Sequence, residues 1–475
     1  MRDIVVLLPG VLGSVLQKDG KDLWNTRQAT FSALTGADAS FQQLVLEEDD
    51  PKFDDLGDGI KVTSLINFPH LVAGLIKIDG YSKLSRLVTD TFKVTKGSIN
   101  DNYPANFFEF PYDWRRDNRV AARKLKKLID ERLPLWQEYS GAKEAKVIFL
   151  AHSMGGLVAR YYLERLEGWS NCRALITFGT PYRGAVDTLN YLANGYKQIQ
   201  LDLTEVMRSF TSIYQLLPIY EMVNIAGKYQ RVAETDGIPN VNKQKAQQAL
   251  AFHREIEDAI NKHLNQVDYL KSGYKTIPIV GIHQDTFQSA KLSDETIIAS
   301  YELPKGIDSI LSDGDGTVPR LSAIPIELDQ EYRETYIAQR HSYLQSSNLV
   351  LNDVRERLKQ MQIPHQPIRG SQLSKDIAQR AAISLNFDDL YLVDEQIKIG
   401  ARILNFREDD GVLIANITPI GGERKTLNIE FEEQKNQWVL NLDNLTPGIY
   451  RLEVKTRKCN PFAPTPLQDF FEVVK

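Results

Sequence analysis

A serine stands where a run of strand-forming residues meets a helical pattern. In the segment LAHSMGGLVAR, residues 150–160, Ser153 follows the apolar run 146–152 and precedes two glycines. A sharp turn from strand to helix strains its central residue and lifts that side chain clear of the sheet, which requires small neighbours. Ala151 and Gly155 occupy the flanking positions of the G-x-S-x-G pattern, with alanine replacing the first glycine. The segment predicts Ser153 as an exposed nucleophile, and a plain Ser-Gly turn is the alternative.

A serine hydroxyl is a weak nucleophile until a base removes its proton, so this prediction requires a histidine that is held by a carboxylate. After a turn of this kind, the acid and the histidine follow the serine along the chain. The stretch SDGDGTVPR, residues 312–320, offers Asp313 and Asp315. Both acids stay open at this point, and a plain Asp-Gly turn or a cation-binding loop is the alternative.

Three histidines lie after this acidic stretch or shortly before it. His283 ends a strand pattern but precedes the acids, and His365 lies beside prolines. His341 follows the strand pattern of residues 333–339 by one residue and begins a helical segment. We therefore predict His341 as the general base, with a surface-loop histidine as the alternative. Three further histidines are expected to be packing or surface residues: His152, which adjoins the serine but is expected to point away from it, His253 and His263.

Acyl transfer also requires backbone N–H groups where negative charge develops. One donor is the amide of Met154, the residue after the serine. The second is expected in the loop of LLPGVLGS, residues 7–14, which follows an early strand pattern. Val11 is the predicted donor there, with Leu12 next in line.

Short apolar runs of strand character alternate with helix-length segments over the first two thirds of the chain. They predict a mainly parallel sheet with both faces covered, an α/β fold, over residues 1–365. Residues 186–275 show no convincing strand, so we predict an inserted helical cap over one end of the sheet. The strand patterns cover residues 3–8, 106–110, 146–151, 173–179, 276–283 and 333–339.

The composition changes beyond the α/β pattern. Residues 366–382 are polar and predict a linker. Residues 383–475 carry short strand patterns separated by turn signals and no helical segment, which predicts a small β-sandwich. The stretch TPGIYRLEV within it is similar to bacterial immunoglobulin-like modules.

Composition excludes several classes of protein. The 475 residues are 42 % hydrophobic and 25 % charged, as in a globular protein of two or three domains. The net charge of −5 gives no basic face for nucleic acid. No paired His/Cys spacing, calcium loop or G-x-x-x-x-G-K loop occurs, so no metal or other cofactor is predicted.

We expect the protein to be located in the cytoplasm. Its N-terminal apolar run stops at Pro9, which is too short for a signal peptide, and no run reaches the roughly 18 apolar residues of a membrane span. Its two cysteines, Cys172 and Cys459, lie far apart, so we expect no structural disulfide and a reducing compartment. Residues 65–78 and 212–223 are apolar candidates for peripheral contact with a bilayer, with ordinary core helices as the alternative.

Seven stretches together resemble the lecithin:cholesterol acyltransferase family, which includes the lysosomal phospholipase A and the phospholipid:diacylglycerol acyltransferases. Their order and spacing match over residues 3–360. The resemblance implies an α/β-hydrolase fold, a capped acyl-binding pocket and acyl transfer from a lipid ester. The stretches are VVLLPGVLGS, GYSKL, FPYDWR, AHSMGGLVAR, FGTPYRGA, RSFTSIYQLLP and DGDGTVP.

Carried over by position, the resemblance selects Asp315 over Asp313 as the acid. It places the nucleophile at Ser153, the histidine at His341 and the oxyanion donors at Val11 and Met154. It also gives weaker candidates for substrate contact, for which a packing role is the alternative: Leu12, Tyr112, Asp113, Trp114, Arg115 and Thr180. The chain lacks the secretory signal and lid disulfide of animal members, so lid behaviour and sterol use stay open.

The predicted function is serine-dependent acyl transfer through an acyl-serine intermediate. Water as acceptor makes the protein a lipase or phospholipase A, and an alcohol makes it an O-acyltransferase; the sequence does not separate them. Two alternatives come from other classes. One is a soluble carboxylesterase or thioesterase on small esters. The other is a binding or scaffold protein with a vestigial hydrolase domain, whose sandwich binds a partner that the sequence does not identify.

Overall fold

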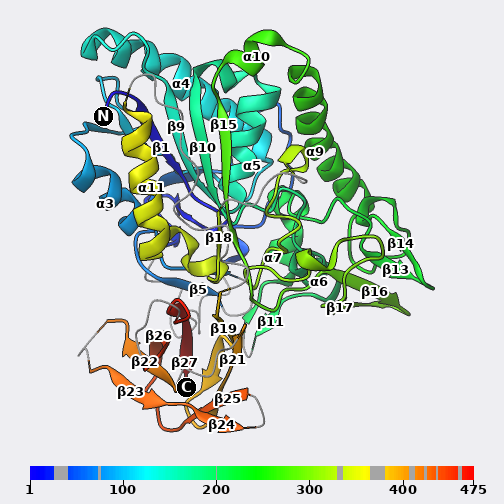
Figure 1. Cartoon of the computed structure of the whole chain (residues 1–475). Coiled ribbons are helices and arrows are strands. Elements are labelled where there is room, and N and C mark those ends of the chain that lie inside the picture. The colour runs from blue at the N-terminus through cyan, green and yellow to red at the C-terminus, as the bar shows by residue number, and fades with distance from the viewer. Residues whose placement is uncertain are drawn as a thin grey trace.

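The computed structural model describes residues 1–25, 41–72, 76–198, 201–328, 335–363, 380–405, 412–421, 425–434, 437–457 and 463–475. A large α/β unit occupies the upper part of Figure 1, and an all-β unit formed by the C-terminal residues lies beneath it. Most of the predicted linker, residues 366–382, lies outside the described ranges.

The α/β unit is built on a parallel sheet with the strand order β18-β15-β10-β9-β1-β8-β7. Every neighbouring pair in it is parallel, so all the strands end at the same edge. The six predicted strands are confirmed, and β7 is an addition. The bounds are β1 (Ile4–Leu8), β7 (Lys96–Gly97), β8 (Phe107–Glu109), β9 (Val147–His152), β10 (Cys172–Phe178), β15 (Lys275–Gly281) and β18 (Tyr336–Ile337).

Alternate side chains of the strands enter two separate cores, as the period of two along a strand requires. On β1, Val6 packs on one face with helices α4 (Asn118–Ser140) and α5 (Met154–Arg160). Val5 packs on the other face with α3 (Ser82–Thr91) and α11 (Asn348–Met361). Helices thus cover both faces of the sheet (Figure 1), and the predicted α/β fold is confirmed.

Small antiparallel elements extend the N-terminal part of the unit. Strands β2 (Ser14–Lys18), β3 (Lys21–Trp24) and β4 (Ile60–Leu65) form one sheet, and β5 (His70–Val72) pairs with β6 (Ile76–Ile78). The apolar segment 65–78 is therefore a strand end and a hairpin in its described part, and the core-helix alternative is wrong for it.

The region between β10 and β15 contains the expected helices and also strands. The expectation that it holds no strand is wrong, because two short strands pair with a later hairpin into the sheet β14-β13-β16-β17. Three-residue strands are too short to show a period of two. In the turn between them Ala226 and Gly227 both have positive φ, as a tight hairpin requires. The elements are α6 (Val186–Asn194), β11 (Lys197–Gln198), β12 (Leu201–Asp202), α7 (Thr204–Ser209), α8 (Thr211–Tyr214), β13 (Val223–Ile225), β14 (Lys228–Gln230), α9 (Lys243–His263) and α10 (Val267–Lys271), with β16 (Ser289–Ser293) and β17 (Thr296–Ser300) following β15.

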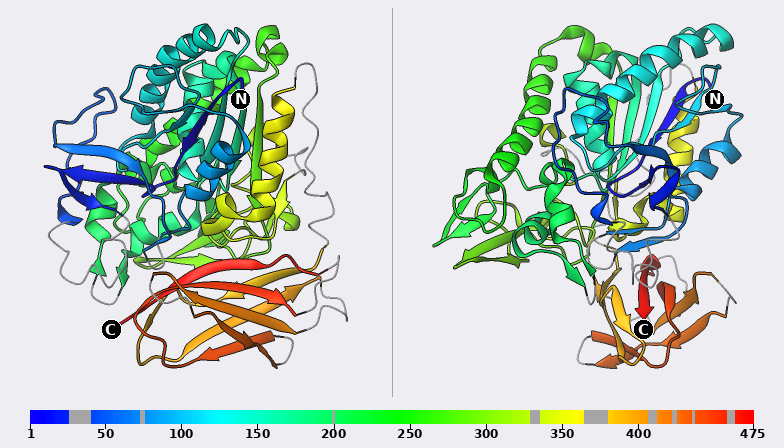
Figure 2. Two further views of the ribbon diagram at one scale, coloured as in Figure 1. Left: turned by 90° about the vertical axis from the view of Figure 1, so that its left-hand side faces the viewer. Right: turned by 180° about the vertical axis from the view of Figure 1, so that it is seen from behind.

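The C-terminal unit is all-β, as predicted, and has a hydrophobic core of its own. Its two main sheets have the orders β19-β21-β25-β24 and β20-β27-β26-β22-β23. In Figure 2 this sandwich lies beneath the α/β unit, and β27, coloured red, runs along the face that meets it. The bounds are β19 (Ala382–Asn386), β20 (Leu390–Leu392), β21 (Ile397–Leu404), β22 (Leu413–Pro419), β23 (Leu427–Glu430), β24 (Glu432–Gln434), β25 (Gln437–Leu442), β26 (Gly448–Thr456) and β27 (Leu467–Val474).

Membrane-spanning helices are a separate question from surface contact. Within the described ranges, no helix has both the length and the apolar character needed to cross a bilayer.

Candidate active site

Ser153 occupies a strained turn between β9 and α5. Its backbone has φ 50° and ψ −125°, a region that residues other than glycine seldom adopt. Its N–H donates to the carbonyl of Phe178 at the end of β10, at 2.9 Å, which ties the turn to the neighbouring strand. Such strain is typical of residues that a fold holds in place for function.

The two glycines behind the serine let other parts of the backbone and side chains come close. A Cβ on Gly155 would lie 2.4 Å from the carbonyl oxygen of Pro9, and one on Gly156 would lie 2.1 Å from Thr180 Oγ1. Thr180 Oγ1 in turn donates to the carbonyl of Ser153 at 2.8 Å. The turn is therefore packed against the loop after β1 on one side and the loop after β10 on the other.

The structure brings the predicted serine, histidine and acid together. His341 Nε2 lies 3.0 Å from Ser153 Oγ, and His341 Nδ1 lies 2.7 Å from Asp315 Oδ2. The second oxygen of Asp315 accepts the backbone N–H groups of Thr317 and Val318, at 3.0 and 2.7 Å. Because both carboxylate oxygens have protein donors, Asp315 is placed to orient the histidine rather than to bind a cation.

Asp313, the other acid in that stretch, faces a different histidine. Its Oδ2 accepts the backbone N–H of His283 at 2.9 Å and lies 3.2 Å from His283 Nδ1. Arg320 Nη1 lies 3.6 Å from its Oδ1. Asp313 and His283 thus fix a loop away from the serine, and His365 lies outside the described residues.

The predicted oxyanion donors lie beside the serine. Val11 lines the same cavity as Ser153. Met154 is the first residue of α5, so its N–H has no partner within the helix. Leu12 has φ 58°, and its carbonyl accepts from Trp24 Nε1 at 2.8 Å. The placement suits Val11 and Met154 as donors, and their role stays a prediction.

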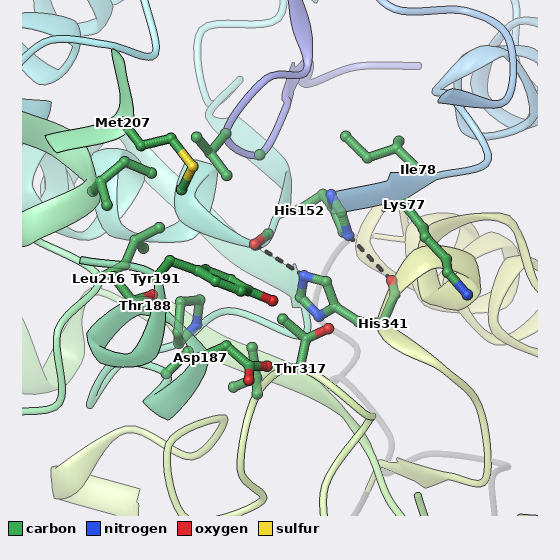
Figure 3. A pocket seen from close by; sticks show the side chains of 17 residues that line it. Lys77, Ile78, His152, Asp187, Thr188, Tyr191, Met207, Leu216, Thr317 and His341 are labelled. Atoms are coloured by element: carbon green, nitrogen blue, oxygen red, sulfur yellow. Dashed lines mark hydrogen bonds between the residues drawn. The ribbon is translucent and has the colours of Figure 1, made fainter. Parts of the chain in front are cut away.

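A cavity opens beside the serine. Figure 3 shows the apolar side chains of Met207 and Leu216 on one side of it, Ile78 and Lys77 across from them, and Asp187 and Thr317 below His341. One wall is thus apolar enough for an acyl chain. The lining residues Ile213 and Leu216 come from the apolar segment 212–223, so the sequence contained a signal for this wall.

The weaker candidates for substrate contact form hydrogen bonds and ion pairs with other parts of the protein. Tyr112 donates from its hydroxyl to Pro9 O at 2.8 Å, and Trp114 Nε1 donates to Ser14 O at 2.9 Å. Arg115 is buried and pairs with Asp113 and Asp58. Their role as substrate contacts stays a prediction. All six of these candidates lie outside the lining of the cavity: Leu12, Tyr112, Asp113, Trp114, Arg115 and Thr180.

His152 has a closer relation to the site than the sequence suggested. Its ring packs on that of His341 with centroids 5.1 Å apart, and its Nδ1 lies 3.0 Å from the Tyr81 hydroxyl. That hydroxyl accepts the N–H of Gly10 at 2.8 Å. Burial, together with the neighbouring His341, holds the pKa of His152 well below its usual value, so it stays neutral. The other two histidines, which we expected to be packing or surface residues, are buried: His253 bonds to Gln215 and His263 to Glu164.

Asp187 is an unusual carboxylate at the polar side of the cavity. Burial, followed by the charges of Asp315 and Asp389, raises its pKa to about 7. A second, polar cavity adjoins it and is lined by residues of both units, including Asp389 and Asp469 of the sandwich. In the described part of the chain, no group of three or more His, Cys, Asp or Glu residues could hold a metal ion.

The fold and this geometry define the chain as an α/β-hydrolase with serine, histidine and aspartate in triad arrangement. The comparison with known families agrees: residues 72–277 match the model of the lecithin:cholesterol acyltransferase family. The resemblance drawn from the motifs is therefore confirmed over these residues. The matched segment contains Ser153, whereas Asp315 and His341 lie beyond it and are brought in by the fold.

Individual relatives point the same way over shorter segments. The lysosomal phospholipase A and acyltransferase of Canis lupus familiaris is 34 % identical over 119 residues, which cover 23 % of this chain and 28 % of that protein. The human protein of the same name is also 34 % identical, with 23 % and 27 % covered. The phosphatidylcholine-sterol acyltransferase of Gallus gallus is 27 % identical over 45 % of this chain and 51 % of its own length. The chain thus spans between about a quarter and half of the length of these relatives.

Proposed function

We propose that the protein transfers acyl groups from a lipid ester through an acyl-serine intermediate. The observation that carries this proposal is the chain of contacts from Asp315 through His341 to Ser153 Oγ, with distances of 2.7 and 3.0 Å, at the wall of a partly apolar cavity. The intact geometry also argues against a vestigial hydrolase domain.

The arrangement supports the following steps. His341 Nε2 takes the proton of Ser153, and the serine oxygen attacks the ester carbonyl. The N–H groups of Met154 and Val11 stabilise the oxyanion, and His341 then gives its proton to the departing alcohol. The acyl group leaves the serine when water or an alcohol attacks it, by the same steps in reverse order.

A lipid ester is the proposed substrate class because the cavity has an apolar wall next to the serine. The matched relatives named as phospholipase A and acyltransferase or sterol acyltransferase support the same class. A small-ester hydrolase is the second candidate, since the triad would serve both.

Product analysis separates these functions. The chain and its Ser153→Ala variant would be incubated with phospholipid vesicles, with and without a long-chain alcohol, and the products followed by mass spectrometry. Free fatty acid or new ester that is absent with the variant supports the proposal, and their ratio separates hydrolase from acyltransferase. Turnover of short soluble esters alone would favour the small-ester hydrolase, and no turnover of any ester by the folded chain would contradict both.

We also propose peripheral contact with the membrane surface through the loop between β4 and β5. Phe68 in this loop has 65 % of its surface exposed, and it lies near the hairpin that supplies Ile78 to the cavity. Exposed aromatic side chains suit insertion into a bilayer surface. A Phe68→Ser variant should float less with vesicles than the wild type. Phe53→Ser is the matched control, because Phe53 is 60 % exposed in a different loop. Equal flotation of all three proteins would remove this part of the proposal.

We also propose that the protein is located in the cytoplasm. Cys172 is a buried free thiol, which a reducing compartment preserves. Fractionation of cells that express the chain, with cytosolic and membrane fractions probed separately, tests this part. Recovery from a secretory compartment would contradict it.

A further inference from the structure

The C-terminal sandwich contacts the histidine loop through one buried carboxylate. Asp469, on β27, has no exposed side-chain surface. Its Oδ2 lies 2.8 Å from Arg340 Nε and 3.0 Å from Lys77 Nζ, and its Oδ1 accepts from Ser342 Oγ at 3.0 Å. Burial acts to raise the pKa of Asp469, but the charges of Lys77 and Arg340 outweigh it and lower that pKa, so the group is an anion.

The partners of this carboxylate flank the histidine on both sides. Arg340 directly precedes His341, and Ser342 directly follows it. Arg340 Nη1 also donates to Leu385 O of β19 at 3.2 Å. Gln339 Nε2 donates to the carbonyl oxygen of Pro466, at 2.9 Å. Each of the three neighbours of His341 thus has a hydrogen bond to the sandwich.

The α/β unit and the sandwich both hold this loop. The preceding strand, β18, has only two residues and lies at the edge of the sheet. Within the unit, the N–H of His341 donates to Asp315 O at 2.8 Å, the N–H of Asp79 donates to Ser342 O at 3.1 Å, and His152 Nε2 lies 3.4 Å from His341 O. Removing one partner of a buried ion pair strongly destabilises a protein, because the other charge is left buried and unpaired. The Asp469 contacts are therefore well suited to fix the position of the loop.

The acid loop is held in the same way. Gln284 exchanges backbone hydrogen bonds with Gly314, next to Asp315, at 3.0 and 3.2 Å. Its side chain donates to Ile383 O at 2.9 Å and accepts from the N–H of Leu385 at 3.4 Å, both in β19. Two of the three loops that carry the triad are therefore attached to the sandwich.

We propose that the C-terminal sandwich is a positioning element of the active site, in which Asp469 holds Arg340 and Ser342 and thereby keeps His341 directed at Ser153. This inference rests on the proposed function. Asp469 is a positioning residue, because it contacts the neighbours of the histidine and not the reacting atoms. The sandwich in this chain is part of the catalytic geometry rather than a separate binding module.

The test uses the full chain and a long-chain alkyl fluorophosphonate. In this reaction Ser153 Oγ forms a bond to phosphorus, the P–F bond breaks, fluoride leaves, and His341 accepts the serine proton. The rate at saturating probe therefore reports how well His341 is placed, whatever the natural lipid is. Asp469→Asn is the principal variant. Glu433→Gln is the matched control, because it removes an exposed carboxylate from β24 of the same sandwich.

We expect Asp469→Asn to lower the saturating labelling rate about tenfold to a hundredfold, since small misplacements of catalytic groups have effects of this size. The probe concentration at half saturation should stay near the wild-type value, and Glu433→Gln should label at the wild-type rate. Asp469→Glu restores the negative charge and should recover part of the lost rate. A merely structural role would lower the folded fraction but not the rate of the folded molecules.

A second variant keeps the test decisive if Asp469→Asn does not fold. Ser342→Ala removes one contact without changing any charge, and we expect labelling about threefold to tenfold slower. Wild-type rates in folded Asp469→Asn, or in Ser342→Ala if the first variant does not fold, would overturn this inference alone. A wild-type chain that does not label at Ser153 would overturn the proposed function, and this inference with it.

Discussion

The serine turn and the histidine loop reach the same site by different means. The turn is held by close packing within the α/β unit, where Gly155 lies against Pro9 and Gly156 against Thr180. The loop of His341 follows a two-residue edge strand and is held by polar contacts to the sandwich. One half of the triad thus depends on local backbone geometry, and the other half depends on a domain that is distant in the sequence.

The largest effect should come from the acid that orients the histidine. Asp315→Asn should lower kcat about 10⁴-fold with little change in KM, because an amide at this position favours the wrong tautomer of His341. Steady-state turnover of a short-chain ester measures it. Asp313→Asn is the control and should stay within a few fold of the wild type, since Asp313 bonds to His283. A larger loss of activity in Asp313→Asn would show that Asp315 is not the acid of the triad.

The next change is directed at the histidine side of the site. Gly179 has φ +57°, and a Cβ there would lie 2.8 Å from both Asp315 Oδ2 and His341 Nδ1. Gly179→Ala should therefore lower kcat about a hundredfold through displacement of the pair. Gly273→Ala separates this effect from backbone strain, because Gly273 has φ +73° and open space around it. Equal activity of the two variants would show that the contact is unimportant.

The corresponding change on the serine side should affect stability most directly. In Gly156→Ala the new methyl group would meet Thr180, and overpacking of this kind costs about 1–3 kcal/mol in the free energy of unfolding. Urea denaturation measures it. Thr180→Ala in the same chain removes two of the three closest atoms and should restore part of the loss. No loss in the single variant would mean that the turn is less tightly packed than described.

A pH effect is expected from Asp187. Its pKa is raised from 3.8 to about 7, first by burial and then by Asp315 and Asp389. Between these pH values the folded chain binds a proton that the unfolded chain has released. The contribution of Asp187 to the free energy of unfolding should therefore fall as pH rises from about 4 to about 7. Asp187→Asn removes this contribution, so the stability of the variant relative to the wild type should rise with pH over this range. Parallel pH profiles of the two proteins would contradict the raised pKa.

The smallest effect is expected from an exposed ion pair between the same two units. Arg402 of the sandwich pairs with Asp285, and both side chains are largely exposed. Arg402→Gln should cost less than about 1 kcal/mol and leave the labelling rate unchanged. A rate loss as large as that of Asp469→Asn would mean that contact between the units in general, and not the Asp469 contacts, positions His341.

Local patterns were sufficient to predict the serine turn and six of the seven strands of the parallel sheet. The run 146–152 and the small residues around Ser153 lie side by side in the sequence, so one short segment predicts strand, turn and helix. The order of acid and histidine after later strands then led to His341, and the family resemblance selected Asp315. The parallel sheet places these loops at one edge, as the structure shows.

Contacts between distant segments could not be predicted in this way. Ser342 and Asp469 are 127 residues apart, and a charged residue in a strand pattern of the sandwich gives no sign of its partner. The hairpin of β13 and β14 was missed for a similar reason, because its sheet is completed by β16 much later in the chain. The role of the FPYDWR stretch was ambiguous, since buried ion pairs and substrate contacts use the same residue types.

The most direct test of the account is to detect the covalent intermediate. The chain would be mixed with a phospholipid that carries an isotope-labelled acyl chain, quenched in acid within the first turnovers, digested and analysed by mass spectrometry. The account predicts the labelled acyl group on the peptide that contains Ser153, and its absence in Ser153→Ala. Turnover of the lipid by the wild type with no acyl group on Ser153 at any time, or with undiminished turnover in Ser153→Ala, would contradict it.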